Sequence, residues 1–253
     1  MTDKILEIKN LNIYFPETDF IAVKDSSFDI KAGEIMALVG ESGSGKSLTA
    51  SAIIGLLPNS AKINGELIYK GESLYPDYPR KLRGKEIALI PQDTLSSLNP
   101  VFRVGEQVYE ALDVWDRKNS REYKKNKVLE CFKRVGITDP ERCYNAYPHE
   151  ISGGMRQRAM IAMAVINEPD IIIADEATTA LDVTVQALII KLLKDLKKTI
   201  LFITHDLGVV AEIADRVIVM KRGEIMEIKT VYDLFEKPDT EYTKNLLAAI
   251  PRL

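Results

Sequence analysis

The segment that constrains the fold most is a glycine-rich stretch, Gly40-Glu41-Ser42-Gly43-Ser44-Gly45-Lys46-Ser47. It follows the apolar run Ile35–Val39 and opens a helical pattern, which is the strand–loop–helix order that a phosphate-binding loop requires. Glycines let backbone N–H groups turn toward phosphate oxygens, and the helix N-terminus adds a positive dipole end. We therefore expect Lys46 to neutralise β- and γ-phosphate charge and Ser47 to bind Mg²⁺.

Short apolar runs alternate with helical patterns along much of the chain. The runs are Ile35–Val39, Ile87–Ile90, Ile171–Ala174, Ile200–Ile203 and Val217–Met220. The helical patterns are Lys46–Leu57, Met155–Ile166, Thr184–Lys197 and Leu207–Ile213. Runs this short and β-branched are typical of strands buried on both faces. The alternation predicts an α/β fold, with a phosphate-loop NTPase core built on a mainly parallel sheet.

Two regions depart from this alternation. Apolar and polar residues alternate in Ile5–Ile13, and Phe28–Ile30 and Glu66–Tyr69 are similar, which predicts an N-terminal antiparallel β layer. Residues from about 93 to 149 are polar, with helical spacing in Val108–Val114 and Arg121–Val135. We expect one domain over residues 1–253, with a core of 1–92 and 150–253 and a helical subdomain of about 93–149.

Composition narrows the possible functions. Lys and Arg number 34 against 37 Asp and Glu, a net charge of −3, which argues against a nucleic-acid partner. The longest apolar run, Ala159–Ile166, is far shorter than the ~18 residues of a membrane span, so we expect a soluble chain that reaches a membrane through partners. Cys131 and Cys143 have no metal-binding spacing and are interpreted as reduced bystander thiols.

A second acidic centre follows the run Ile171–Ala174. Asp175 and Glu176 end this predicted strand, and the carboxyl edge of a parallel strand faces the ligand crevice. We expect Asp175 to hold Mg²⁺, directly or through water, and Glu176 to act as general base on an attacking water. The alternative is an acidic strand end that packs against a basic neighbour.

Further motifs occur in a fixed order around these two centres. They are Gln92, then Ile151-Ser152-Gly153-Gly154-Met155-Arg156-Gln157, then Ala180-Leu181-Asp182, then His205. Together with the phosphate loop they resemble, over nearly the whole chain, the ATP-binding subunits of ABC transporters. The serine and glycines at 152–154 open a predicted helix, so they form a second candidate anion site.

The resemblance implies ATP and Mg²⁺ as cofactors and assigns roles to these residues. The implied catalytic residues are Lys46, Gln92, Glu176 and His205, and the implied metal ligands are Ser47, Gln92 and Asp175. The implied nucleotide-binding residues are Phe15, Gly40, Glu41, Ser42, Gly43, Ser44, Gly45, Lys46, Ser47, Leu48, Ser152, Gly153, Gly154 and Asp182. Phe15 is expected to stack on adenine, with Tyr14 second. The alternatives are core packing for either ring, a helix cap for Ser152, a structural histidine for His205 and a turn for Gln92.

A narrower resemblance points to the peptide and nickel importers of bacteria and archaea. It rests on residues 40–47, 152–158, 180–186 and 242–251, with departures at Ile151, where Leu is usual, and Ala177, where Pro is usual. Many peptide importers of this group continue into a cysteine-rich tail after residues that resemble 242–251. Residues 1–253 contain no such cysteines, which slightly favours the nickel type. The alternatives are an exporter subunit or a soluble ABC ATPase of DNA repair or translation. Soluble ABC ATPases of this kind usually carry a long coiled-coil insertion. The segment between Lys46 and Ser152 is too short to contain one.

The same resemblance implies an assembly. Two ATPase subunits, here related but different chains, would meet head to tail, so that each ATP lies between one phosphate loop and the partner's 152–154 segment. The implied partners are this second ATPase subunit, two permease subunits and an extracytoplasmic substrate-binding protein, with no nucleic acid. The implied location is the cytoplasmic face of the cell membrane, as a peripheral subunit.

Overall fold

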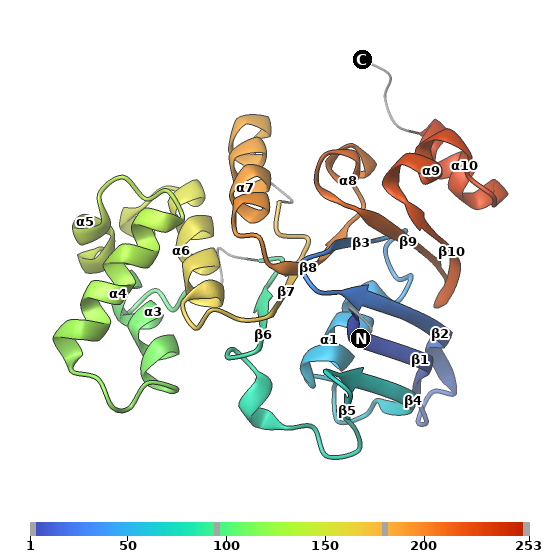
Figure 1. Cartoon of the computed structure of the whole chain (residues 1–253), viewed down its shortest axis with the longest axis horizontal. Coiled ribbons are helices and arrows are strands. Elements are labelled where there is room, and N and C mark those ends of the chain that lie inside the picture. The colour runs from blue at the N-terminus through green and yellow to red at the C-terminus, as the bar shows by residue number, and fades with distance from the viewer. Residues whose placement is uncertain (1–3, 94–96, 179–181, 250–253) are drawn as a thin grey trace. The chain divides into compact units, whose positions relative to one another are not determined.

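The computed structural model describes residues 4–93, 97–178 and 182–249 (Figure 1). The chain divides into two compact units, one of residues 1–80 and 198–253 and the other of residues 81–197. The expected helical region of about 93–149 falls inside the second unit, and its boundaries as a subdomain stay a prediction.

The N-terminal part of the first unit is an antiparallel sheet in the order β2-β1-β4-β5. Its strands are β1 (Lys4–Phe15), β2 (Phe20–Lys31), β4 (Lys62–Tyr69) and β5 (Glu72–Ser73). Alternate residues of β1 such as Leu6, Ile8 and Ile13 are buried, because side chains along a strand point to opposite faces. The predicted antiparallel layer is confirmed, although β2 and β4 begin earlier than the predicted runs.

The rest of the first unit is built around β3 (Ile35–Val39), which lies between β8 (Thr199–Thr204) and β9 (Arg216–Lys221) and pairs with both in parallel. The unit also holds α1 (Lys46–Ile54) and α8 (Leu207–Ile213). The bounds of β3 and α8 agree with those predicted. Helix α1 ends three residues before the predicted Leu57, because Gly55 adopts a left-handed φ of 69° and its N–H bonds back to Ala52 and Ser51.

No element is predicted from the sequence beyond Met220, but the described residues up to 249 form three there. They are β10 (Glu224–Thr230), which pairs antiparallel with β9, α9 (Val231–Glu236) and α10 (Glu241–Ala248). The buried position of β10 is taken by Glu227, which hides the strand pattern. Leu234 of α9 and Tyr242 of α10 are buried in a cluster with Val39 of β3.

The second unit contains the parallel strands β6 (Ile87–Ile90) and β7 (Ile171–Asp175). Its helices are α3 (Val104–Asp113), α4 (Arg121–Arg134), α5 (Pro140–Asn145), α6 (Gly153–Val165) and α7 (Val183–Asp195), with a 3₁₀ turn at Pro148–Glu150. A second 3₁₀ turn, Arg80–Leu82, begins at the last residue of the first unit's N-terminal segment. Helix α3 begins four residues before the predicted Val108. Among the helices of the described residues, none is both long and apolar enough to cross a membrane.

Candidate functional site

The phosphate loop and His205 leave the same edge of the first unit's parallel strands. Val39, the last residue of β3, is opposite Thr204, the last residue of β8. Gly40 and His205 therefore begin the two segments that follow a pair of adjacent, aligned strand ends. This is the edge at which open α/β sheets bind ligands. His205 is exposed, and its contact with a γ-phosphate stays a prediction.

The loop approaches neighbouring backbone so closely that two of its glycines cannot carry a side chain. A Cβ on Gly40 would lie 2.2 Å from the carbonyl oxygen of Met220, and one on Gly45 would lie 2.8 Å from that of Ala22. Gly45, with a left-handed φ of 102°, is also the N-cap of α1. The loop thus leads directly into a helix N-terminus, as the sequence predicts, and such a terminus favours an anion.

Lys46 lies inside the loop rather than in solvent. Lys46 is only 6% exposed, and its Nζ donates to the carbonyl oxygens of Gly40 at 2.7 Å and Glu41 at 2.9 Å. The ammonium group therefore lies against the loop backbone at Gly40 and Glu41, and its contact with phosphate stays a prediction. Ser47 is exposed and Leu48 half-buried on the first turn of α1, and their predicted roles remain predictions.

Segments that are distant in sequence also form hydrogen bonds with the loop. The N–H of Gly223, in the turn between β9 and β10, donates to the carbonyl of Ser44 at 3.0 Å. The N–H of Glu41 donates to the hydroxyl of Tyr242 on α10 at 3.4 Å. Sequence reasoning missed both contacts, because they join residues that lie far apart in the chain.

The two aromatic candidates for adenine stacking line one cavity of about 290 Å³ on the antiparallel sheet. Tyr14 and Phe15 end β1, and Asp19 and Ile21 of the following turn and strand contribute to the same lining. The Phe15 ring also stacks on Phe20, with centroids 6.3 Å apart. Both the predicted ring and its alternative therefore border a ligand-sized space, and the choice of Phe15 stays a prediction.

The second unit repeats the strand-edge arrangement with different chemistry. Ile90, which ends β6, is opposite Ala174 of β7, so Gln92 and Glu176 follow aligned strand ends. The Nε2 of Gln92 donates to the Oε2 of Glu176 at 2.8 Å. Within the described ranges, no group of three or more His, Cys, Asp or Glu side chains could hold a metal ion. Asp175 is half-buried at the end of β7, and its predicted metal role, like that of Gln92, stays a prediction.

The two other candidate binding residues of this unit, Ser152 and Asp182, cap helices. Ser152 precedes α6 and its hydroxyl accepts from the N–H of Met155 at 3.3 Å, while Asp182 caps α7 through the N–H of Val185 at 2.9 Å. The capping alternative for Ser152 is thus correct as a description of its local role. Gly153 is half-buried, and a Cβ there would meet nothing within 4 Å, so the space beside it is open. A Cβ on Gly154 would lie 3.4 Å from the Val185 side chain, which is ordinary contact. Residues 180 and 181 lie outside the described residues.

Gln157 has a role that sequence reasoning missed. It is only 2% exposed, and its Nε2 donates to the carbonyl oxygen of Ala177 at 2.5 Å. The helix that begins with residues 153 and 154 is thereby tied to the backbone next to Glu176. The sequence singles out Gln157 because it ends the motif at 151–157. A polar residue on a predicted helix does not, however, indicate which group its side chain contacts.

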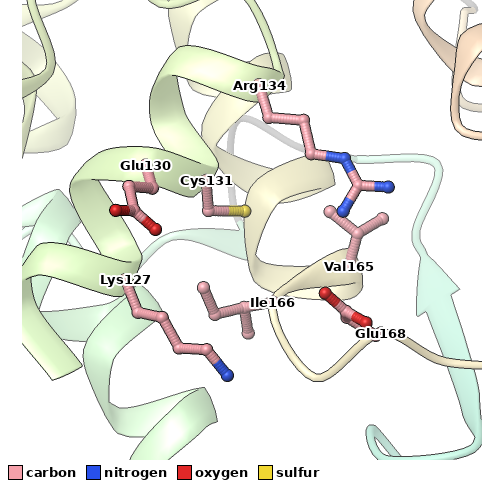
Figure 2. Close-up of a pocket in the computed structure, with 7 residues that line it drawn as sticks. All are labelled: Lys127, Glu130, Cys131, Arg134, Val165, Ile166 and Glu168. Carbon is pink, nitrogen blue, oxygen red and sulfur yellow. The ribbon is translucent and has the colours of Figure 1, made fainter. Parts of the chain in front are cut away.

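A smaller cavity of about 140 Å³ lies between α4 and the end of α6 and contains none of the predicted site residues (Figure 2). The Cys131 thiol points toward α6 and donates to the carbonyl of Ala162 at 3.6 Å. Burial raises the pKa of Cys131 to about 12, so the thiol stays protonated at neutral pH. Cys143 is also buried and unbridged, which agrees with the interpretation of both as bystander thiols.

Comparison with known proteins identifies the family. Residues 23–179 match the family model described as ABC transporter. The dipeptide transport ATP-binding protein DppD of Bacillus subtilis is 47% identical over 99% of this chain and 78% of its own length. The oligopeptide transport ATP-binding protein OppD of the same organism is also 47% identical, over 99% of this chain and 73% of its own length.

Solved structures agree with this result. The ATP-binding cassette MJ0796, a dimer in a post-hydrolysis state with ADP and Pi, has a TM-score of 0.78 and 32% identity, covering 89% of this chain and 98% of that one. The cassette cbiO1 of Clostridium perfringens has a TM-score of 0.78 and 29% identity, covering 99% of this chain and 97% of that one. The fold is thus that of a phosphate-loop NTPase, and the chain belongs to the ABC transporter family as one of its ATP-binding cassettes.

Proposed function

We propose that this chain is the ATP-hydrolysing subunit that powers the import of peptides by a membrane ABC transporter. The observation that carries the proposal is the 47% identity, over 99% of the chain, to a dipeptide transport ATP-binding protein. Nickel, which the narrower resemblance also allows, does not appear in the names of these relatives. We therefore prefer peptides as the transported substrate and leave nickel as an outcome of the test.

In this proposal the phosphate loop binds the triphosphate of ATP. The close backbone approach at Gly40 and Gly45 and the inward position of the Lys46 ammonium support this, because such a loop presents N–H groups and one cation to phosphate oxygens. Ser42, Gly43 and Ser44 complete the loop. Phe15 stacks on the adenine, and His205 contacts the γ-phosphate.

The proposal of magnesium ligands rests on the chemistry of each side chain. Ser47, Gln92 and Asp175 supply a hydroxyl, an amide and a carboxylate oxygen, the oxygen ligands that Mg²⁺ prefers. When bound, the ion neutralises phosphate charge during transfer. Because Gln92 donates to Glu176 through Nε2, its Oε1 remains for the metal. The same hydrogen bond orients the Glu176 carboxylate, which accepts a proton from the attacking water as general base.

We further propose that two such cassettes meet head to tail, each ATP lying between one phosphate loop and the Ser152 segment of the other chain. The exposed Ser152 hydroxyl and the open surface at Gly153 at the start of α6 support a second anion contact. The second cassette is a related but different chain. The remaining partners are two permease subunits and an extracytoplasmic substrate-binding protein, which place this subunit at the cytoplasmic face of the membrane.

The substrate is tested by ATP hydrolysis in proteoliposomes that contain this chain, its partner cassette, the permeases and the binding protein. Hydrolysis is measured with no addition, with dipeptides or oligopeptides, and with Ni²⁺. The proposal expects peptides to stimulate turnover and to accumulate in the compartment where ATP is hydrolysed. Stimulation by Ni²⁺ alone would contradict peptides as substrate, and movement of peptide in the opposite direction would contradict import.

The head-to-tail arrangement is tested in a mixed complex in which only this chain carries Ser152→Ala. Nucleotide trapped during turnover is then assigned to each chain by photo-crosslinking. The expected loss is at the partner's phosphate loop, since the Ser152 segment would face across the interface. A loss at the mutated chain's own loop would overturn the arrangement.

A further inference from the structure

The C-terminal helix α10 contacts the phosphate loop through one side chain. The hydroxyl of Tyr242 accepts a hydrogen bond from the backbone N–H of Glu41, with 3.4 Å between nitrogen and oxygen. Glu41 is the second residue of the loop, and both residues belong to the first compact unit. The proposed function assigns nothing to α10, so this contact is unexplained by it.

The Tyr242 ring has a fixed position. The residue is 8% exposed and packs in a cluster with Val39, Val217 and Leu234. The Lys221 ammonium lies 4.3 Å from the ring centroid, a favourable cation–π distance. Burial raises the pKa of Tyr242, so its hydroxyl remains neutral at neutral pH and can both accept from the Glu41 N–H and donate.

Helix α10 is itself anchored to the sheet. Glu227 of β10 is a buried carboxylate that accepts from the N–H groups of Asp239 at 3.0 Å and Thr240 at 3.4 Å, and from the Thr240 hydroxyl at 3.0 Å. The Thr240 hydroxyl also caps α10 by accepting from the N–H of Thr243 at 3.1 Å. These bonds define where the first turn of α10, and with it Tyr242, must lie.

Glu41 is therefore held from two sides. Tyr242 accepts from its N–H, and the Lys46 ammonium donates to its carbonyl oxygen at 2.9 Å. The peptide groups on both sides of this one residue are fixed by groups from α10 and α1. A loop that is ordered before the ligand arrives loses less conformational entropy on binding.

We propose that Tyr242 is a positioning residue that fixes the first half of the phosphate loop at Glu41 and thereby raises the affinity of this chain for ATP. The inference rests on the proposed role of the loop in ATP binding. It makes α10 part of the nucleotide site, acting through the loop and not on the nucleotide itself. A neutral hydrogen bond of this kind corresponds to about a three- to tenfold change in the dissociation constant.

The test uses the full chain with Tyr242→Phe, which keeps the ring in its cluster and removes only the hydroxyl. The control is Tyr232→Phe on α9, a tyrosine that is 74% exposed. The dissociation constant for Mg-ATP is measured by calorimetry, and amide hydrogen exchange is followed in a peptide spanning residues 40–45. We expect Tyr242→Phe to weaken ATP binding about three- to tenfold and to speed exchange in that peptide, and Tyr232→Phe to do neither.

A purely structural role for the hydroxyl would give a different result. It would lower the unfolding temperature and speed exchange in α10, with the dissociation constant for ATP unchanged, and that result would overturn the proposal. In the assembled transporter, the proposal expects a higher KM for ATP with little change in kcat. Absence of ATP binding by the wild-type chain would instead contradict the proposed function, so the two failures are distinguishable.

Discussion

Two strand edges carry the candidate chemistry, and they are built by the same rule but held in different ways. At the first, β3 and β8 end together and are followed by the phosphate loop and His205. At the second, β6 and β7 end together and are followed by Gln92 and Glu176. The first is held by side chains and by close approach of its backbone to that of neighbouring segments, whereas the bonds that hold the second come from the side chains of Gln92 and Gln157.

This difference separates what each edge can tolerate. The loop at the first edge cannot accept a Cβ at Gly40, since its backbone touches that of Met220. At the second edge Glu176 has a left-handed φ of 47°, and its carboxylate accepts a hydrogen bond from Nε2 of Gln92. Changes at the first edge should therefore alter nucleotide binding, with or without an effect on turnover, whereas changes at the second should alter turnover and leave binding nearly unchanged.

The largest effect is expected for Lys46→Ala at the first edge. It removes the ammonium group that lies inside the loop, so both ATP binding and turnover should fall, turnover by roughly 100-fold or more. ATP binding and hydrolysis are measured in the assembled complex. The exposed Lys62→Ala on β4 is the matched control and should behave like wild type. Wild-type turnover in Lys46→Ala would contradict the proposed role of the phosphate loop in ATP hydrolysis.

A smaller effect at the same edge is expected for Gly40→Ala. Its Cβ would lie 2.2 Å from the Met220 oxygen, so the loop must shift and ATP affinity should fall about tenfold or more. Gly33→Ala is the control, because Gly33 also has a positive φ but a Cβ there meets nothing within 4 Å. Gly33→Ala should lose stability of about 1 kcal/mol and keep its ATP affinity. Equal ATP affinities in the two variants would show that close approach does not matter.

The third effect concerns the second edge. Gln157→Leu removes the donor to the Ala177 carbonyl and leaves that acceptor unpaired next to Glu176. Turnover should fall by about five- to tenfold while the dissociation constant for ATP stays within about twofold, since the loop is untouched. Parallel measurements of kcat and ATP binding check this. If Gln157→Leu lost ATP affinity but kept its kcat, the second edge would affect binding and not turnover, which would contradict the proposed difference between the edges.

The smallest effect is a pH dependence at the anchor of α10. Burial alone would raise the pKa of Glu227, but hydrogen bonds from Thr243, Asp239 and Thr240 outweigh it and lower the pKa below its ordinary value. The carboxylate therefore stabilises the fold fully above the ordinary pKa of about 4.3, and this contribution is lost as pH falls through the lowered value.

Glu227→Gln should consequently flatten the loss of stability between roughly pH 5 and 3, compared with wild type, in thermal unfolding scans. Lys229 lies 3.9 Å from the same carboxylate and is left unchanged in this variant. The exposed Glu236→Gln on α9 is the control and should retain the wild-type slope. A wild-type slope in Glu227→Gln would show that its hydrogen bonds do not favour the charged form.

The sequence predicts the parts of the molecule whose signal is local. The bounds of β3 and β6 are predictable because short apolar runs buried on both faces have no competing pattern. The phosphate loop is predictable because its pattern is contiguous. Gln92 and Glu176 are each singled out by the order of motifs, but the hydrogen bond between them is not predicted. β10 is missed because the buried Glu227 interrupts its apolar pattern, and α9 and α10 after it have no predicted counterpart.

The contacts that the sequence does not predict are those between residues far apart in the chain. Tyr242 and Glu41 are 201 positions apart, and the sequence around either residue does not predict a contact with the other. Gln157 and Ala177 are likewise joined only by the packing of α6 near the end of β7. Such partners depend on tertiary structure, which is why motif spacing points to candidate reacting groups but not to the groups that contact them.

The account rests most directly on the separation between a binding edge and a chemical edge, and Glu176→Gln tests it. The amide oxygen can still accept from Gln92 Nε2, but it cannot take a proton from water, so turnover should fall by about 100-fold or more. ATP affinity should stay near wild type, because the phosphate loop is unchanged. ATP binding and single-turnover hydrolysis on one preparation of the assembled complex measure both quantities. Hydrolysis within about threefold of wild type would contradict the assignment of Glu176 as general base and, with it, the division between the two edges.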